Sequence, residues 1–403
     1  MTDSATAAST AAGTGSTRAR NLTLLLVASL TMMSGTTIAP SLPAIEARFA
    51  DTENVALLAR LVLTIPALFI ALSAPLAGFI ADRYGRRRLL LLAIVAYGFS
   101  GMSGLVVDSL FAILAGRALL GMAVAGTMTT GTALVGDYFT GAERDRFMGR
   151  QSAFIGVGGI VFLVGGGLLA EMHWRAPFAV YGVAFALLPA VLLWLYEPAR
   201  GQRHGAGGAA AATGAPGWAL AVFALFGLAL LSMITFYVLP TQLPFFLQTM
   251  ADDTPSRTGL AMGTLTLVMA VASLGFARVR NRLGVAPTLG LGLGLLAAGI
   301  ALVGAAHSYL AVVAAMAVAG VGMGISMPNL MAAALAIAPV AVRGRVAGGL
   351  TASFFIGQFV SPFLSQPLVG AFDFATMFTI VAAVLGAVAA ATAAVGLRSA
   401  RAA

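Results

Sequence analysis

The chain has 403 residues, of which 60% are hydrophobic and only 9% charged, and its mean hydropathy is +0.96. About a quarter of the residues of a soluble domain are charged, so this composition excludes a soluble protein. The chain has no cysteine and three histidines, so disulfides and thiolate metal sites are excluded and we expect no metal and no cofactor. Its net charge of +9 would suit nucleic acid, but the placement of the arginines gives that charge another meaning.

Apolar runs follow one another along the sequence, and a membrane-spanning helix needs about 20 apolar residues. The first 20 residues are small and polar and predict a disordered tail over 1–20. No short apolar segment with a cleavage site precedes the first run, so we expect no removable signal peptide. Twelve spans are predicted, at about 21–43, 58–81, 89–107, 110–136, 151–170, 177–196, 217–247, 259–277, 286–306, 309–338, 347–370 and 374–397.

The arginines divide unequally between the two sides of the membrane. An even number of spans places both termini on one side, and that side receives 18 arginines against 4 on the other. By the positive-inside rule this bias places both termini in the cytoplasm. The basic charge is therefore an orientation signal, and we expect no nucleic-acid partner. The richness in Ala, Gly and Arg, without any Lys, suggests a bacterial gene, so we expect the protein in the bacterial inner membrane.

The sequence resembles itself when shifted by about 200 residues. At a shift of 199, Arg83 and Gly85 match Arg282 and Gly284, Gly121 matches Gly320, and Arg144 matches Arg343. The repeat predicts an all-α membrane protein of two six-helix bundles, 21–198 and 217–397, related by a pseudo-two-fold axis. A Gly- and Ala-rich cytoplasmic linker at 199–216 joins them, and a short tail at 398–403 follows. Two such bundles suit alternating access to a site between them.

The loop after the second span reads GFIADRYGRRR at 78–88 and resembles the loop signature of the major facilitator superfamily. Gly78, Asp82, Arg83, Gly85, Arg86 and Arg87 match that signature. Arg117 and Gly121 of LAGRALLG resemble the family's fourth-span signature. Gly85 would allow a tight turn, and Gly78 would let neighbouring backbones approach closely.

The resemblance implies a clamp on the cytoplasmic side. Asp82 would dock near the start of span 11, around 346–349, and either Arg83 or Arg86 would reach Asp137. Arg144 is a further gating candidate from the repeat. The glycine signature that marks the family's drug–proton antiporters is broken in span 5, where Phe162 and Leu163 replace its Gly-Pro pair. We expect the remaining glycines there to serve close helix packing.

Ionisable residues are scarce within the spans. All 14 acidic residues fall at span ends or in loops, and only Arg117 lies well inside a span. An intramembrane charge is a functional hypothesis by default. The resemblance links Arg117 to proton handling or substrate charge, and the alternative is that it bonds span-end carbonyls or snorkels outward. Glu46 and Asp137 are the better candidates for proton coupling. The remaining cavity candidates are polar but uncharged: Thr36, Tyr237, Gln242, Asn329 and Gln358.

The sequence thus predicts a monomeric secondary transporter in contact with membrane lipid and a small-molecule substrate. We expect it to export small amphiphilic compounds by alternating access, with proton exchange. The alternative is an importer or uncoupled facilitator of a small organic acid that uses Arg117 as an anion anchor. A membrane enzyme or scaffold is the rival from another class, and the spans show no catalytic motif that favours it.

Overall fold

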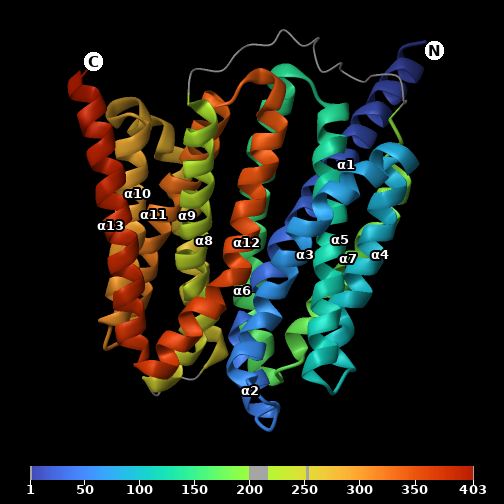
Figure 1. Cartoon of the computed structure of the whole chain (residues 1–403). Helices are drawn as coiled ribbons and strands as arrows, with labels where there is room; N and C mark the ends of the chain where they lie inside the picture. Colours follow the sequence, from blue (N-terminus) through green and yellow to red (C-terminus); the bar gives the residue numbers. More distant parts are fainter. Residues whose placement is uncertain (1, 199–216, 251–253, 403) are drawn as a thin grey trace.

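The computed structural model describes residues 2–198, 217–250 and 254–402, and every regular element in this part of the chain is a helix (Figure 1). The first half contains α1 Thr2–Thr36, η1 Ala39–Ser41, α2 Leu42–Arg48, α3 Val55–Tyr84, α4 Arg86–Met102, η2 Ser103–Leu105, α5 Leu110–Tyr138, α6 Gly141–Met172, η3 Ala176–Gly182 and α7 Val183–Trp194. The second half contains α8 Trp218–Thr249, α9 Pro255–Leu283, α10 Val285–Gly304, α11 Tyr309–Ile337, η4 Val340–Val342, α12 Arg343–Ala371 and α13 Phe374–Ala402.

Twelve helical segments of the described chain are long and apolar enough to cross a membrane, which confirms the predicted fold class. Several helices run past the apolar residues that mark them in the sequence. Helix α6 begins at Gly141, ten residues before the predicted span, because a charged segment continues the helix beyond the apolar part. Helix α1 includes residues 2–20, where the sequence predicts a tail, and the linker 199–216 lies outside the described residues. The domain boundaries stay predictions.

The internal repeat has matching local structure in the two halves. Gly85 ends α3 with φ +106° and Gly284 ends α9 with φ +85°, both in the left-handed region that favours glycine. A Cβ at Gly121 would overlap the carbonyl oxygen of Pro66, and a Cβ at Gly320 would lie 2.6 Å from that of Leu265. Pro66 and Leu265 are themselves 199 residues apart. The same crossing of two helices, made close by a glycine, is therefore built twice.

Each half packs around its own hydrophobic core. Most buried residues of the first core lie between Leu24 and Leu195, and most of those of the second lie between Val222 and Ala389. Helices of the first half lie on the right of Figure 1 and those of the second on the left, with α6 and α12 between them. Two buried residues join the core of the other half: Phe245 packs in the first core and Leu163 in the second.

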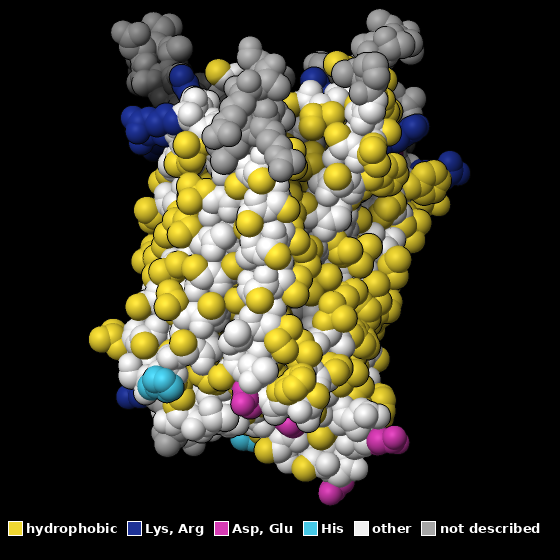
Figure 2. Space-filling view, turned by 60° about the vertical axis from the view of Figure 1, so that its left-hand side comes forward, with side chains coloured by type: hydrophobic (Ala, Val, Ile, Leu, Met, Phe, Trp, Pro, Cys, Tyr) yellow, Lys and Arg dark blue, Asp and Glu magenta, His cyan; other side chains and the backbone are white. Residues whose placement is uncertain are grey.

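Both ends of the chain lie at the same end of the helix bundle, at the top of Figure 1. We call this end the terminal face, and the end that holds α2 and the last turn of α8 the opposite face. In Figure 2, arginine side chains gather near the terminal face and most acidic side chains visible from this side lie near the opposite face. The arrangement follows the charge bias expected from the sequence.

The two halves pack tightly at the opposite face. Helix α6 crosses α9 there, and a Cβ at Gly167 would lie 2.9 Å from the carbonyl oxygen of Pro255. In return, a Cβ at Gly259 would lie 2.7 Å from the carbonyl oxygen of Leu163. A Cβ at Gly166 would overlap the carbonyl oxygen of Thr37, just after α1 ends. Gly166 and Gly167 thus serve close packing, as expected, whereas a Cβ at Gly165 would meet no atom within 4 Å.

Candidate functional site

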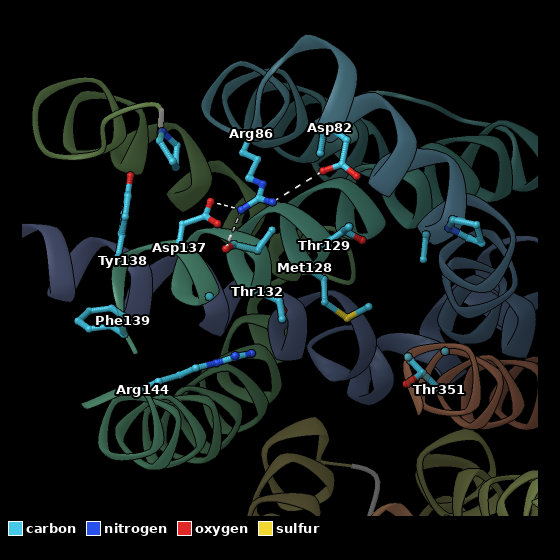
Figure 3. A pocket seen from close by; sticks show the side chains of 18 of the residues that line it. Asp82, Arg86, Met128, Thr129, Thr132, Asp137, Tyr138, Phe139, Arg144 and Thr351 are labelled. Carbon is cyan, nitrogen blue, oxygen red and sulfur yellow. Dashed lines mark hydrogen bonds and ion pairs between the residues drawn. The ribbon is translucent and has the colours of Figure 1, made fainter. Parts of the chain in front are cut away.

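A pocket of 1440 Å³ lies between the two halves on the side of the terminal face. The first half supplies most of its walls from α3, α5 and the start of α6, and the second half supplies Gly344, Gly348, Thr351, Ala352 and Phe355 from α12. Figure 3 shows the polar and charged residues that face this space.

The pocket reaches toward the middle of the membrane. Ile70 lines its inner part and precedes Tyr84, the last residue of α3, by 14 residues. At a rise of 1.5 Å per residue, that is about 21 Å along the helix. Helix α3 has 30 residues, so Ile70 lies near its midpoint. Because the opposite face is packed shut, the pocket is accessible from the terminal face.

The inner walls of the pocket are uncharged, and the charges gather at its mouth. Met128, Thr129, Thr132, Thr351 and Phe355 face the inner part. The charged lining residues lie at or just beyond helix ends on the terminal face: Asp82, Arg86, Asp137, Arg144 and Glu197. A mixture of hydroxyl, thioether and aromatic groups suits loosely specific amphiphilic ligands.

Arg86 organises the charges at the mouth. Its Nη1 forms an ion pair with Asp137 Oδ2 and donates to the carbonyl oxygen of Ala133 at 3.1 Å. Its Nη2 lies 3.7 Å from Asp82 Oδ1 (Figure 3). Of the two arginines that the sequence offered for Asp137, the structure places Arg86 there.

The turn between α3 and α4 is held by a residue that the sequence reasoning missed. Glu197 Oε1 accepts a hydrogen bond from the backbone N–H of Arg86 at 2.7 Å, and Oε2 accepts one from Arg87 at 2.9 Å. A carboxylate at a helix N-terminus satisfies donors that lack an intrahelical partner. A Cβ at Gly85 would lie 3.1 Å from this carboxylate. The signal in the sequence was an acidic residue directly after span 6.

Other gating candidates are placed differently from the expectation. Asp82 is 74% exposed and lines the pocket with Gly344 and Gly348, and no hydrogen bond to α12 is among its described contacts. Arg144 extends into the pocket from α6 (Figure 3). Gly78 does not mark a close approach: a Cβ there would lie 3.8 Å from Thr129, an ordinary contact. The docking of Asp82 on α12 stays a prediction for a state in which the terminal face is closed, and a gating role for Arg83, outside the pocket lining, also stays a prediction.

Arg117 is fully buried and donates to oxygens of the first half. Its Nη2 donates to the Ser34 carbonyl at 2.6 Å, Nε to the Val62 carbonyl at 2.9 Å and Nη1 to Tyr181 Oη at 2.8 Å. Ser34 is in the last turn of α1, where carbonyls lack helical partners. Val62 lies four residues before Pro66, which has no N–H to bond its carbonyl. Arg117 therefore satisfies carbonyls that the helix end and the proline leave free.

The remaining substrate and proton candidates lie outside this pocket. Tyr237 of α8 lies against α1, since a Cβ at Gly35 would be 3.4 Å from its Oη. Asn329 is buried between α11 and α10, where its Nδ2 donates to the Val285 carbonyl at 3.0 Å. Thr36 donates to the Met32 carbonyl of its own helix at 3.3 Å, and Gln358 is half-buried on α12. Their roles stay predictions.

Glu46 and Gln242 meet at the opposite face through Arg60, which the sequence reasoning counted only as a side-specific arginine. Arg60 Nη1 lies 2.7 Å from Glu46 Oε2, and Arg60 Nε donates to Gln242 Oε1 at 2.9 Å.

Among the described residues, no three His, Cys, Asp or Glu side chains gather as a metal site would require.

Two similar helical bundles, with a pocket between them on one side and close packing at the opposite face, are typical of membrane transporters built from parallel repeats. The model of the Major Facilitator Superfamily matches residues 24–252 and 225–402. The chain belongs to this family, a family of transporters rather than enzymes, and is a multi-pass membrane protein with twelve spans. Its members carry small molecules across membranes.

Known relatives and structures agree with this assignment. Multidrug resistance protein 1 of Bacillus subtilis is 36% identical over 136 residues, which cover 32% of this chain and 34% of that protein. The class C tetracycline resistance protein of Escherichia coli is 31% identical over 146 residues, covering 36% and 37%. The matched region is thus about a third of the length of these relatives. A bacterial homologue of the human lysosomal transporter Spinster, in an inward-facing and occupied conformation, has a similar fold at 17% identity, with a TM-score of 0.74 over 94% of this chain and 96% of that chain.

Proposed function

We propose that the protein exports small amphiphilic compounds from the cytoplasm by alternating access, with the terminal face toward the cytoplasm. The observation that carries this proposal is the pocket itself: it opens at the arginine-rich face, reaches the midplane and ends in uncharged walls. An exporter must admit its substrate from the cytoplasmic side, and such walls bind apolar and hydroxyl-bearing groups without demanding a fixed charge.

The relatives support export over uptake. The two named above are a multidrug resistance protein and a tetracycline resistance protein. Resistance by transport requires removal of a compound from the cell.

The contacts of Arg117 weigh against the alternative of an organic-acid importer. An anion anchor needs donors that face the substrate cavity. Arg117 lies outside the pocket lining and directs its bonds to Ser34, Val62 and Tyr181. The alternative would need a different cation, and the arginines of this pocket lie at its mouth.

Proton exchange completes the proposal, with Asp137 and Glu46 as the carboxylates that bind and release the proton. Each is paired with an arginine, Arg86 at the terminal face and Arg60 at the opposite face. Rocking of the halves would change access to these pairs from the two sides of the membrane in turn.

Vesicles of defined orientation test export. With tetracycline as the probe, inverted vesicles should accumulate it in the presence of an inward-acidic pH gradient, and right-side-out vesicles should not. Accumulation only in right-side-out vesicles would overturn the assigned direction. If the tetracycline flux is the same after the pH gradient is collapsed, transport is not coupled to protons and the protein is an uncoupled facilitator.

A further inference from the structure

Arg60 is a buried arginine of α3 that binds both halves of the protein at the opposite face. Its side chain is only 2% exposed, although it lies near the start of a membrane span. We propose that Arg60 is the positioning residue that holds the opposite face closed, by linking Glu46 of the first half to Gln242 of the second. This inference rests on the alternating access proposed above and identifies a residue that controls it.

The bonds of Arg60 divide between the two halves. Glu46 and the Ala56 carbonyl, both in the first half, accept from Nη1. Gln242 of α8 accepts from Nε, and the ring of Phe245 lies 3.7 Å from the guanidinium carbon. Two of the contacts therefore stay when the halves separate, and two are lost.

The second half holds Gln242 in place for this contact. Gln242 is fully buried, and its Nε2 donates to Ser365 Oγ of α12 at 2.9 Å. Its Oε1 is thereby directed at Arg60. The hydrogen-bonded chain from Glu46 through Arg60 and Gln242 to Ser365 joins α2, α3, α8 and α12.

The contacts of Arg60 with Gln242 and Phe245, which we call the latch, are strong enough to favour the closed opposite face and weak enough to break when it opens. A hydrogen bond between a charged donor and a neutral amide is stronger than one between neutral groups, and a cation over an aromatic face adds attraction. An ion pair across the halves would hold more tightly, but here the counter-charge, Glu46, is in the same half as Arg60. While Glu46 is ionised, the arginine therefore keeps its counter-charge when the face opens.

The other ion pairs that the structure describes lie within the first half. Arg86 pairs with Asp82 and Asp137 at the terminal face, and Arg175 pairs with Asp108 at the opposite face. Arg175 also donates to the carbonyls of Leu105 and Val107, again in the first half. It offers a matched control: an arginine at the same face with an acidic partner but no described bond to the second half.

A single cysteine can report opening of the opposite face, because the chain has no cysteine of its own. Ser41 is 1% exposed in η1, which packs against α6, α8 and α9, and its hydroxyl has no hydrogen-bond partner among the described residues. Ser41→Cys should react with a polar maleimide only when the halves separate. Ser100→Cys, at a buried position of α4 within the first half, is the control for general loosening of the fold.

The maleimide reaction is measured on the full chain in nanodiscs, without substrate. Arg60→Met and Gln242→Leu should each raise the labelling rate of Ser41→Cys about tenfold, the change expected on loss of one charge-assisted bond. Gln242→Glu should lower it, because an ion pair then crosses the halves. Arg175→Met should leave it within about twofold, and the labelling of Ser100→Cys should not change.

If Arg60→Met does not fold, the labelling rate of Gln242→Leu still tests the role of the Arg60–Gln242 bond, because this variant keeps the Glu46–Arg60 pair. A wild-type labelling rate in Gln242→Leu, or an equal rise in Arg175→Met, would overturn the latch. The labelling rate is measured without substrate and does not depend on transport. A wild-type protein that fails to move tetracycline would therefore overturn the proposed export but not the role of Arg60 in closing the opposite face.

Discussion

The contacts of Arg117 make a quantitative prediction about the stability of the first half. Replacing it with methionine keeps the length of the side chain and removes all three donated bonds. The Val62 carbonyl is then buried without a partner, whereas the Ser34 carbonyl keeps the Tyr181 hydroxyl as a donor at 3.4 Å. Each buried carbonyl without a partner costs about 1–3 kcal/mol. The Val62 carbonyl therefore predicts that Arg117→Met lowers the free energy of unfolding by at least about 1–3 kcal/mol.

Equilibrium unfolding in mixed micelles measures this loss, with tryptophan fluorescence as the signal. Arg117→Lys should fall between wild type and methionine, since an ammonium cannot reach three acceptors in the fixed geometry of a guanidinium. Arg48→Met, at an exposed position of α2, controls for the removal of one positive charge and should stay near wild type. Wild-type stability in Arg117→Met, together with lost transport or altered anion preference, would refute the structural role and return Arg117 to the substrate or the proton.

Further substitutions test the terminal face and the helix contacts. Asp82→Asn should reduce tetracycline transport severalfold with expression and melting temperature close to wild type, and unchanged turnover would contradict the clamp. Gly121→Ala should destabilise the fold by about 1–3 kcal/mol because its Cβ overlaps a backbone oxygen of α3, whereas Gly78→Ala, with room for a methyl group, should be tolerated. The Thr376 N–H bond to Asp373 holds the pKa of this exposed carboxyl below its usual value, with the Thr376 hydroxyl adding to the effect. The ionised Asp373 carboxylate should therefore stabilise the fold at pH values above its pKa in the unfolded chain. This stabilisation should be lost as the pH falls through its lower pKa in the folded protein. Asp373→Ala should remove this dependence of the melting temperature on acidic pH, and an unchanged dependence would contradict the stabilising role of the Asp373–Thr376 hydrogen bond.

The twelve spans and the repeat could be predicted because the lipid environment permits few backbone conformations within the membrane. Every backbone group within the membrane must be satisfied internally, so long apolar runs become helices. Matched glycines such as Gly85 and Gly284 mark turns that few other residues allow. The ends of the helices could not be placed this way, because the charged start of α6 is helical without being apolar.

The candidate site was harder to predict because its contacts join residues far apart in the sequence. The charge at Arg117 was visible, and Pro66 signalled a free carbonyl four residues before it, but their proximity appears only when α3 and α5 pack together. Arg60 and Gln242 are 182 residues apart and meet only across the two halves. Glu197 lies after the last span of its half and returns to the turn at Gly85.

The central claim is that one face closes as the other opens. Distances between spin labels on paired cysteines test it directly, with Thr140 and Val340 labelled at the terminal face and Asp51 and Gln248 at the opposite face, all exposed positions. As tetracycline and pH are varied, we expect one distance to shorten whenever the other lengthens. Two distances that stay fixed, or that lengthen together, would contradict it.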